Sequence, residues 1–322
     1  MKRHLLILAT TAAAFAPATP GFAAPLERKD VAADPALLLH VDCDALRNSA
    51  VAQAVLNEPE VQDKLAAVGA LFDFDFRKQL HGLTVYTTME HPKDGALILY
   101  ADFDTNRLIT LAKAADNFQC ATNGSHVIYS WLEDKKKSKE GPPPRFFGAI
   151  MGHRLVFGQE QAHLAAALEV MDGNAANFSR SSALPGPAAG ESVLIQGVIL
   201  KFDFDNPDPK AAIFKMSKSV RLRLSEMGSN LAATVNFEAA DDNAATQVAA
   251  IAQGLVAILK LQQGDADALK LANAIAIKQN GPTVGLTLSF PSSEVIDMIK
   301  DKQAQAARSA QHASPPPEKT NS

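Results

Sequence analysis

The sequence predicts an α+β fold made of two tandem repeats, each an antiparallel sheet with helices packed on it in the order β-α-ββ-α-ββ-α. Three observations lead to this fold class. Apolar and polar residues alternate along many short segments, which is typical of antiparallel strands with one buried and one solvated face. Turn residues join these segments in pairs, and helical periodicity follows each pair. The same order of elements occurs twice along the chain.

The clearest hairpin surrounds the turn Met227-Gly228-Ser229-Asn230. Apolar side chains alternate with polar ones, such as Arg221 and Arg223, on both sides of this turn. One face of the hairpin should therefore be buried and the other solvated. The apolar positions are Val220, Leu222, Leu224, Leu231, Ala233, Val235 and Phe237.

A helix follows this hairpin, with Asp241 or Asp242 as its N-cap and Gly264 at its end. A second hairpin then turns at Asn280-Gly281, a pair that favours a tight primed turn. Ser292 and Ser293 are suited to cap a closing helix. The apolar stripe of the first helix contains Val248, Ile251, Leu255 and Ile258, and the second hairpin contains Ile275, Ile277, Val284, Leu286, Leu288 and Phe290.

The first half repeats this order of elements. Leu83 and Val220 occupy equivalent strand positions, Asp104 and Asp241 occupy equivalent helix starts, and each pair is separated by 137 residues. Each half also has a preceding strand and the string Phe-Asp-Phe-Asp, at 72–75 and 202–205. Duplication explains this agreement, and a chance match within one continuous α+β domain is the alternative. The predicted segments of the first half are strands at 37–41, 83–85, 97–103, 120–131 and 146–157, with helices after Asp104 and at 161–171.

The predicted organisation follows from these repeats and from composition. Residues 1–23 form a signal peptide, 31–178 and 192–308 form the two repeats, 179–191 form a small-residue linker, and 309–322 form a disordered tail. The lysine-rich segment 134–144 should be a solvated loop, because it lacks apolar residues that would offset the entropy of ordering.

The start of the chain predicts export. Lys2 and Arg3 precede a short apolar run, and Gly21-Phe22-Ala23 supplies the small residues that signal peptidase requires, so cleavage should fall between Ala23 and Ala24. No later stretch reaches the roughly 18 apolar residues of a membrane helix. Removing the signal peptide takes the formal charge from −4 to −6. A net acidic chain is a poor match for nucleic acid.

Two motifs of the first half resemble uncharacterised exported bacterial proteins of mixed α/β composition. These motifs are Gly82-Leu83-Thr84-Val85-Tyr86 and Ser125-His126-Val127-Ile128-Tyr129-Ser130-Trp131. The resemblance implies export and fold, and it implies no activity.

No constellation in the sequence predicts catalysis, a cofactor or a metal. The acidic strings at 73–75, 102–104 and 203–205 lack the glycine and downstream glutamate of a calcium loop, so helix capping and turns explain them better. Histidines have no pair at helical spacing that would form a zinc site. His40 and Asp42 share the outward face of a strand, where a general base could act, although exposed strand residues form such pairs without catalysis.

The two cysteines, Cys43 and Cys120, are a candidate disulfide. Both share strand parity with apolar neighbours and should point toward the core of the first repeat. A bridge would stabilise the protein by about 4 kcal/mol in the chain-entropy model. Two separate buried thiols are the alternative.

These observations predict an exported soluble protein, periplasmic or secreted, that binds or scaffolds without catalysis. Its partner would be an envelope or extracellular protein or an apolar ligand. Strands apolar on both faces, such as 96–103, suggest a carrier of an apolar ligand. An exported hydrolase with a site assembled from distant residues is the alternative, so the sequence leaves enzyme activity open.

Overall fold

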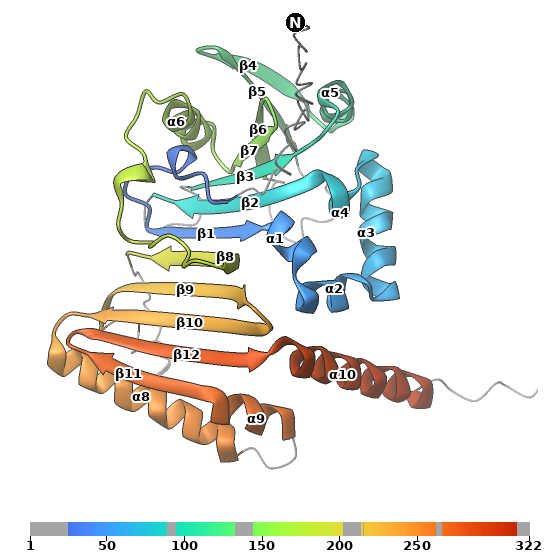
Figure 1. Ribbon diagram of the computed structural model, residues 1–322. Helices are drawn as coiled ribbons and strands as arrows, with labels where there is room; N and C mark the ends of the chain where they lie inside the picture. Colours follow the sequence, from blue (N-terminus) through green and yellow to red (C-terminus); the bar gives the residue numbers. More distant parts are fainter. Residues whose placement is uncertain are drawn as a thin grey trace, which may run out of the picture.

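The computed structural model describes residues 25–88, 95–132, 144–201, 214, 216–261 and 266–313. It has an α+β fold, as predicted, in which one antiparallel sheet of 12 strands runs through the whole molecule (Figure 1). The predicted signal peptide, most of the lysine-rich loop, the second Phe-Asp-Phe-Asp string and the end of the tail lie outside the described residues.

The first half of the chain contributes seven strands to this sheet and carries helices on both of its faces. Its elements are η1 (Arg28–Asp30), β1 (Leu37–Asp42), α1 (Cys43–Asn48), α2 (Ala50–Leu56), α3 (Pro59–Phe72), α4 (Phe76–Gln79), β2 (Leu80–Thr87), β3 (Gly95–Ala101), α5 (Thr105–Ala114), β4 (Gln119–Asn123), β5 (His126–Leu132), β6 (Arg145–Met151), β7 (Arg154–Gly158), α6 (Gln161–Met171) and η3 (Phe178–Arg180).

The second half contributes five strands, and both of its predicted hairpins are present. Gly228 (φ 61°) and Gly281 (φ 55°) adopt the left-handed conformation in the two turns, which glycine tolerates without strain. The elements are β8 (Glu191–Ile199), β9 (Ser217–Met227), β10 (Asn230–Ala239), α8 (Asp242–Leu261), α9 (Ala266–Ala274), β11 (Ile275–Asn280), β12 (Thr283–Pro291) and α10 (Ser292–Ala313).

The two halves meet where β1 pairs with β8. Leu37 lies opposite Ile199 and Val41 opposite Ile195 in this antiparallel pair. The full strand order is β11-β12-β10-β9-β8-β1-β2-β3-β7-β6-β5-β4, so the halves lie side by side and their strands do not interleave. The prediction of a separate sheet in each repeat is therefore corrected to one continuous sheet.

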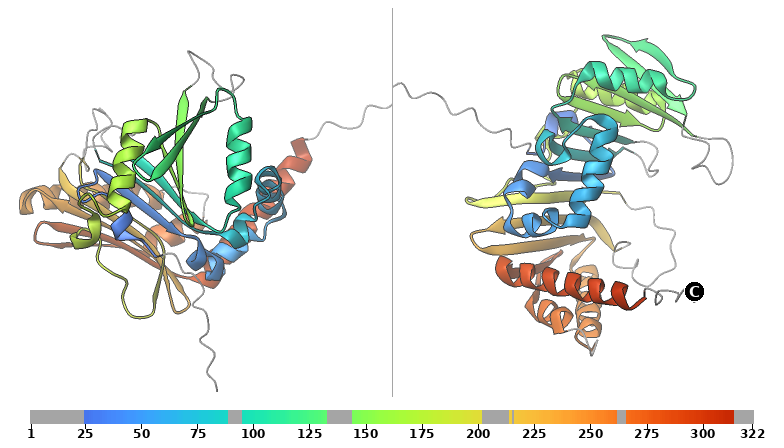
Figure 2. Two further views of the ribbon diagram at one scale, coloured as in Figure 1. Left: turned by 90° about the horizontal axis from the view of Figure 1, so that it is seen from above. Right: turned by 90° about the vertical axis from the view of Figure 1, so that its right-hand side faces the viewer.

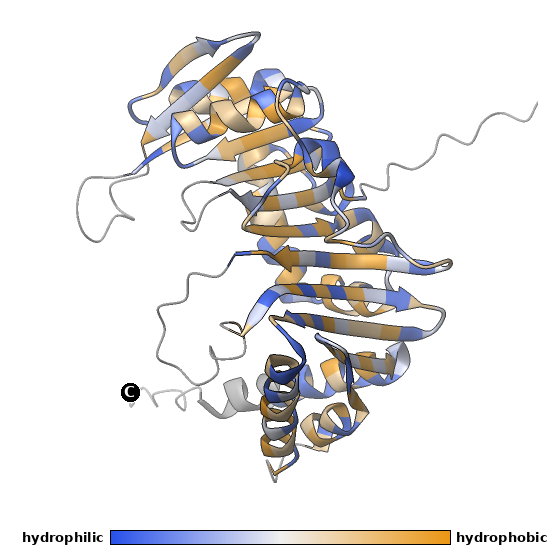
Figure 3. Ribbon diagram, turned by 90° about the vertical axis from the view of Figure 1, so that its left-hand side faces the viewer, coloured by the Kyte–Doolittle hydropathy of each residue, from blue (hydrophilic) through white to orange (hydrophobic). Residues whose placement is uncertain are grey.

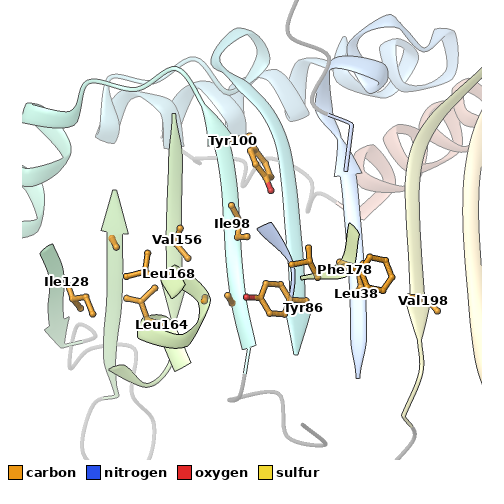
Figure 4. Close-up of a cluster of buried hydrophobic side chains, with 14 of the residues drawn as sticks. Leu38, Tyr86, Ile98, Tyr100, Ile128, Val156, Leu164, Leu168, Phe178 and Val198 are labelled. Carbon is orange, nitrogen blue, oxygen red and sulfur yellow. The ribbon is translucent and has the colours of Figure 1, made fainter. Parts of the chain in front are cut away.

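The larger core packs α6 against one face of the first half (Figure 4). Leu38 of β1, Ile98 of β3 and Val156 of β7 are buried there against Leu164 and Leu168 of α6. The second half also supplies Val198 of β8 to this core. A smaller core lies between α8 and the second half of the sheet, and it contains Val220, Phe237, Ala239, Ala245, Val248, Ala249, Ala252 and Val284.

The segment 179–191, predicted as a linker poor in apolar anchors, packs against the larger core. Leu184 is buried within it. The Arg28 guanidinium donates hydrogen bonds to the carbonyl oxygens of Ser181, at 2.9 Å, and of Leu184. Composition did not predict this attachment, because Leu184 is the one buried residue of the segment and the hydrogen bonds from Arg28 go to backbone carbonyl oxygens. At the other boundary, α10 continues to Ala313, beyond the predicted start of the tail at residue 309.

Helix α8 is the one helix in the described part of the chain with the length and apolar composition of a membrane span. The sequence analysis predicted no helix of this kind after the signal peptide. Its N-terminal half packs on the sheet, whereas its last turns expose Leu255, Ile258, Leu259 and Leu261. Figure 3 shows the alternation of hydrophobic and hydrophilic residues along the strands that α8 covers.

Candidate functional site

Helix α5 has an apolar face that the protein buries only in part. Asp104 begins the helix as predicted, because its Oδ1 accepts hydrogen bonds from the backbone N–H groups of Asn106 (2.9 Å) and Arg107 (3.1 Å). Apolar residues follow at helical spacing, with Leu108, Leu111 and Ala112 on one stripe. None of the residues of α5 is buried, although such a stripe normally packs against a sheet.

Opposite this stripe, three strands present apolar and aromatic side chains on one face of the sheet. The register places Tyr129 of β5, Gly148 of β6 and Phe157 of β7 in one row across the sheet. The ring of Trp131 meets the ring of Phe157 edge-on, with 6.4 Å between centroids. A Cβ atom on Gly148 would come within 3.1 Å of the Phe157 ring, so the glycine leaves room for these rings.

A half-open cavity of about 410 Å³ lies between α5 and this face. Seen from above, α5 and α6 lie on opposite sides of the strands, so this cavity is on the face that α6 does not cover (Figure 2). Among the described residues of its lining no side chain is charged, and the polar side-chain groups are the Tyr129 hydroxyl and the Trp131 indole N–H. The lining residues are Phe72, Leu108, Ile109, Leu111, Ala112, Ala115, Tyr129, Trp131, Gly148, Ala149, Ile150, Leu155 and Phe157. We call this the α5 pocket.

A second, more polar cavity of about 540 Å³ contains the His40 and Asp42 side chains. His40 is 1% exposed and its Nδ1 lies 2.8 Å from the hydroxyl of buried Thr84. Asp42 caps α1 by accepting a hydrogen bond from the N–H of Ala45 at 2.8 Å. The prediction that both residues lie on an outward face is wrong, because they share with Leu38 the more buried face of β1.

An ionic network borders the same polar cavity. His81 lies between two carboxylates, with Nδ1 3.1 Å from Asp44 and Nε2 3.0 Å from Asp102. Arg47 also pairs with Asp44, and His153 lies 3.1 Å from Asp102. The hydrogen bond from His81 lowers the pKa of Asp102 below its usual range. These contacts fasten α1, β2 and the β6–β7 turn together, and they present no activated nucleophile.

The acidic strings make helix caps and turns where the structure describes them. Asp75 caps α4, and Asp73 ends α3 in the left-handed conformation (φ 51°). Asp102 differs, because it joins the ionic network. Within the described ranges, no group of three or more His, Cys, Asp or Glu side chains is arranged to hold a metal ion.

Both cysteines are free thiols in the structure. Cys120 is exposed on β4, at the edge of the sheet, so its predicted core-facing orientation is wrong. Six inter-strand steps separate β4 from β1, which directly precedes Cys43, and a disulfide requires Cα atoms within about 7 Å. Burial raises the pKa of the Cys43 thiol to about 11, so it stays protonated at neutral pH. The signal-cleavage residues Ala23 and Ala24 lie outside the described residues.

Comparison with known proteins gives a weak resemblance of fold only. No protein-family model matches the chain, and no curated protein matches it. Two crystal forms of the Treponema protein TP0453 are similar in structure. Form I has a TM-score of 0.45 and 10% sequence identity, covering 86% of this chain and 98% of that one. Form III has a TM-score of 0.43 and 9% identity, covering 85% and 97%.

Proposed function

We propose that this protein is a non-catalytic binding protein for a small apolar ligand, which occupies the α5 pocket. One observation carries the proposal: α5 has an apolar stripe that is only half-buried, held across a cavity from an apolar sheet face. The volume of about 410 Å³ falls in the range of small-molecule sites. A ligand between α5 and the sheet would complete a core that the chain leaves open.

The second half of the molecule provides an internal comparison. Its helix α8 also lies on the sheet after a hairpin, but Ala245, Val248, Ala249 and Ala252 of α8 are buried against the strands. The same arrangement of helix and sheet is therefore a filled core in one half and a half-open pocket in the other. The contrast applies to the N-terminal half of α8, because its last turns expose Leu255, Ile258, Leu259 and Leu261.

Trp131 makes the proposal directly testable, because it is the one tryptophan of the chain and it lines the pocket. Titration with a series of n-alkyl alcohols should shift its fluorescence to the blue as water leaves the indole. Affinity should rise roughly fourfold for each added methylene, since burying one methylene contributes about 0.8 kcal/mol, until the chain fills the pocket.

Free tryptophan amide titrated with the same alcohols is the control for solvent effects. Alkyl chains that adhere to the exposed end of α8 would not change the emission of Trp131, so the signal is specific to the pocket. An unchanged spectrum, or a shift that does not depend on chain length, would refute the binding function.

We also propose that the protein is exported and acts in the periplasm or outside the cell. The support is the basic start at Lys2 and Arg3, the apolar run after it and the small residues Gly21 and Ala23. Expression in a bacterial host should yield a mature product that begins at Ala24, as read by N-terminal sequencing of the periplasmic fraction. A product that keeps Met1 and stays in the cytoplasm would contradict export.

We further propose that the two halves descend from one duplicated unit. In support, β8, β9, β10, β12 and β11 follow each other across the sheet as β1, β2, β3, β7 and β6 do. Leu83 pairs with Leu99, and Val220 pairs with Phe237, so the offsets are 137 residues in one strand and 138 in the next. Asp104 and Asp241 both cap the helix that follows. A crystal structure whose halves fail to superpose through these five strands would overturn the duplication.

A further inference from the structure

We infer that the ligand of the α5 pocket is an acidic amphiphile, with its alkyl chain in the pocket and its carboxylate at Arg107. This inference rests on the proposed binding function and specifies the ligand class. The described residues that line the pocket are uncharged, so an ionised group must remain at its rim. Arg107 of α5 is a cation next to that rim, and it contacts the lining residue Phe72.

The geometry of α5 places Arg107 next to the pocket. Residues four apart lie on the same face of a helix, so Arg107 precedes the lining residue Leu111 by one turn. The Nε of Arg107 also donates a hydrogen bond of 3.1 Å to the carbonyl oxygen of Phe72, which lines the pocket and is 43% exposed. This hydrogen bond uses the inner nitrogen and holds the guanidinium next to Phe72. The two outer nitrogens, Nη1 and Nη2, take no part in it.

The outer nitrogens of Arg107 have a weak partner. Nη1 lies 3.7 Å from Oδ2 of Asp73, which is beyond hydrogen-bond distance, and the two side chains are 43% and 77% exposed. A carboxylate from a ligand could form the short bidentate pair that this contact lacks. Asp73 would then compete with the ligand for the same guanidinium.

A charge elsewhere on the helix serves as the comparison. Lys113 is exposed and lies four residues after the lining residue Ile109, at the other edge of the pocket-facing side of α5. If general attraction between a cationic helix and an anion governed binding, Lys113 and Arg107 would contribute alike. If the carboxylate is bound at the rim of the pocket, only Arg107 should matter.

The test compares decanoate with decyl alcohol, which share an alkyl chain and differ in the head group, by Trp131 fluorescence and calorimetry. Arg107→Gln should weaken decanoate binding roughly fivefold, the upper range for a partly exposed ion pair. Asp73→Asn should strengthen it roughly twofold to threefold by removing the competitor. Asparagine tolerates the left-handed backbone of position 73, so this variant should fold normally.

Decyl alcohol should bind all variants with unchanged affinity, and Lys113→Gln should change neither ligand. A loss of both ligands in Arg107→Gln would mean that Arg107 only positions Phe72, and the inference would fail. Equal binding of decanoate by Arg107→Gln and the unaltered protein would overturn it as well. Failure of the alcohol to bind the unaltered protein would instead remove the proposed function itself, so the two failures are distinguishable.

Discussion

Replacing Arg154 with methionine should lower the free energy of unfolding by about 3–5 kcal/mol, because it leaves a buried carboxylate without its cation. Arg154 of β7 pairs with Asp30 of η1 at 2.8 Å, and Asp30 is fully buried. The hydroxyl of Tyr100 donates a second hydrogen bond to Asp30, at 3.2 Å. Burial and the charge of Asp30 raise the pKa of Tyr100, so this hydroxyl stays protonated and remains a donor.

Urea unfolding followed by circular dichroism measures this loss. The exposed pair of Lys201 and Asp34, also at 2.8 Å, provides the matched control, and Lys201→Met should cost less than about 1 kcal/mol. The double variant Asp30→Asn with Arg154→Met should recover much of the loss, since no uncompensated charge remains. An Arg154→Met protein as stable as the control variant would show that the buried pair does not fasten the N-terminal segment to the sheet.

Local elements of this fold could be predicted from the sequence because their signals are local. The turns at Gly228 and Gly281 are flanked by alternating apolar residues, and the helix caps Asp104 and Asp241 precede helical periodicity. Alternation identifies the two faces of a strand, but it does not identify the neighbouring strands. The pairing of β1 with β8 joins residues more than 150 positions apart, so it had no local signal.

The same limit explains the errors at single residues. Cys120 was predicted to face the core because it lies on the same side of its strand as an apolar neighbour. However, β4 is the last strand of the sheet and the thiol is exposed. His40 was assigned to the solvated face of β1, yet β1 lies in the middle of the sheet and the face that carries Leu38 and His40 is its buried one. In both cases the position of the strand in the sheet decides exposure, and that position depends on non-local pairing.

The α5 pocket was only partly foreseeable. Strands apolar on both faces, such as β3, indicated that an apolar ligand was an option for this chain. The cavity lies beside β5, β6 and β7, where Gly148 and the rings of Trp131 and Phe157 meet α5. Sequence periodicity shows that α5 has an apolar stripe, but not whether the stripe contacts the sheet, because that depends on the length of the connecting loops and on α3.

Filling the α5 pocket should weaken ligand binding strongly without unfolding the protein. Ala112 lines the cavity from α5, and Ala112→Phe would place an aromatic ring in the space of about 410 Å³. The ring would exclude several methylenes of a decyl chain, so its affinity should fall roughly 100-fold at about 0.8 kcal/mol per methylene. Because the ring would bury apolar surface against the sheet, the free energy of unfolding should stay unchanged or rise by about 1 kcal/mol.

The matched control is Ala114→Phe, which adds the same ring to the exposed side of the same helix. This variant should bind decyl alcohol as the unaltered protein does, with the same shift in the emission of Trp131. Urea unfolding of both variants checks that each is folded. If Ala112→Phe is folded and still binds decyl alcohol with unchanged affinity, the alkyl site lies elsewhere. The exposed leucines of α8 would then be the next surface to alter, and the half-buried stripe of α5 would have to be explained without a ligand.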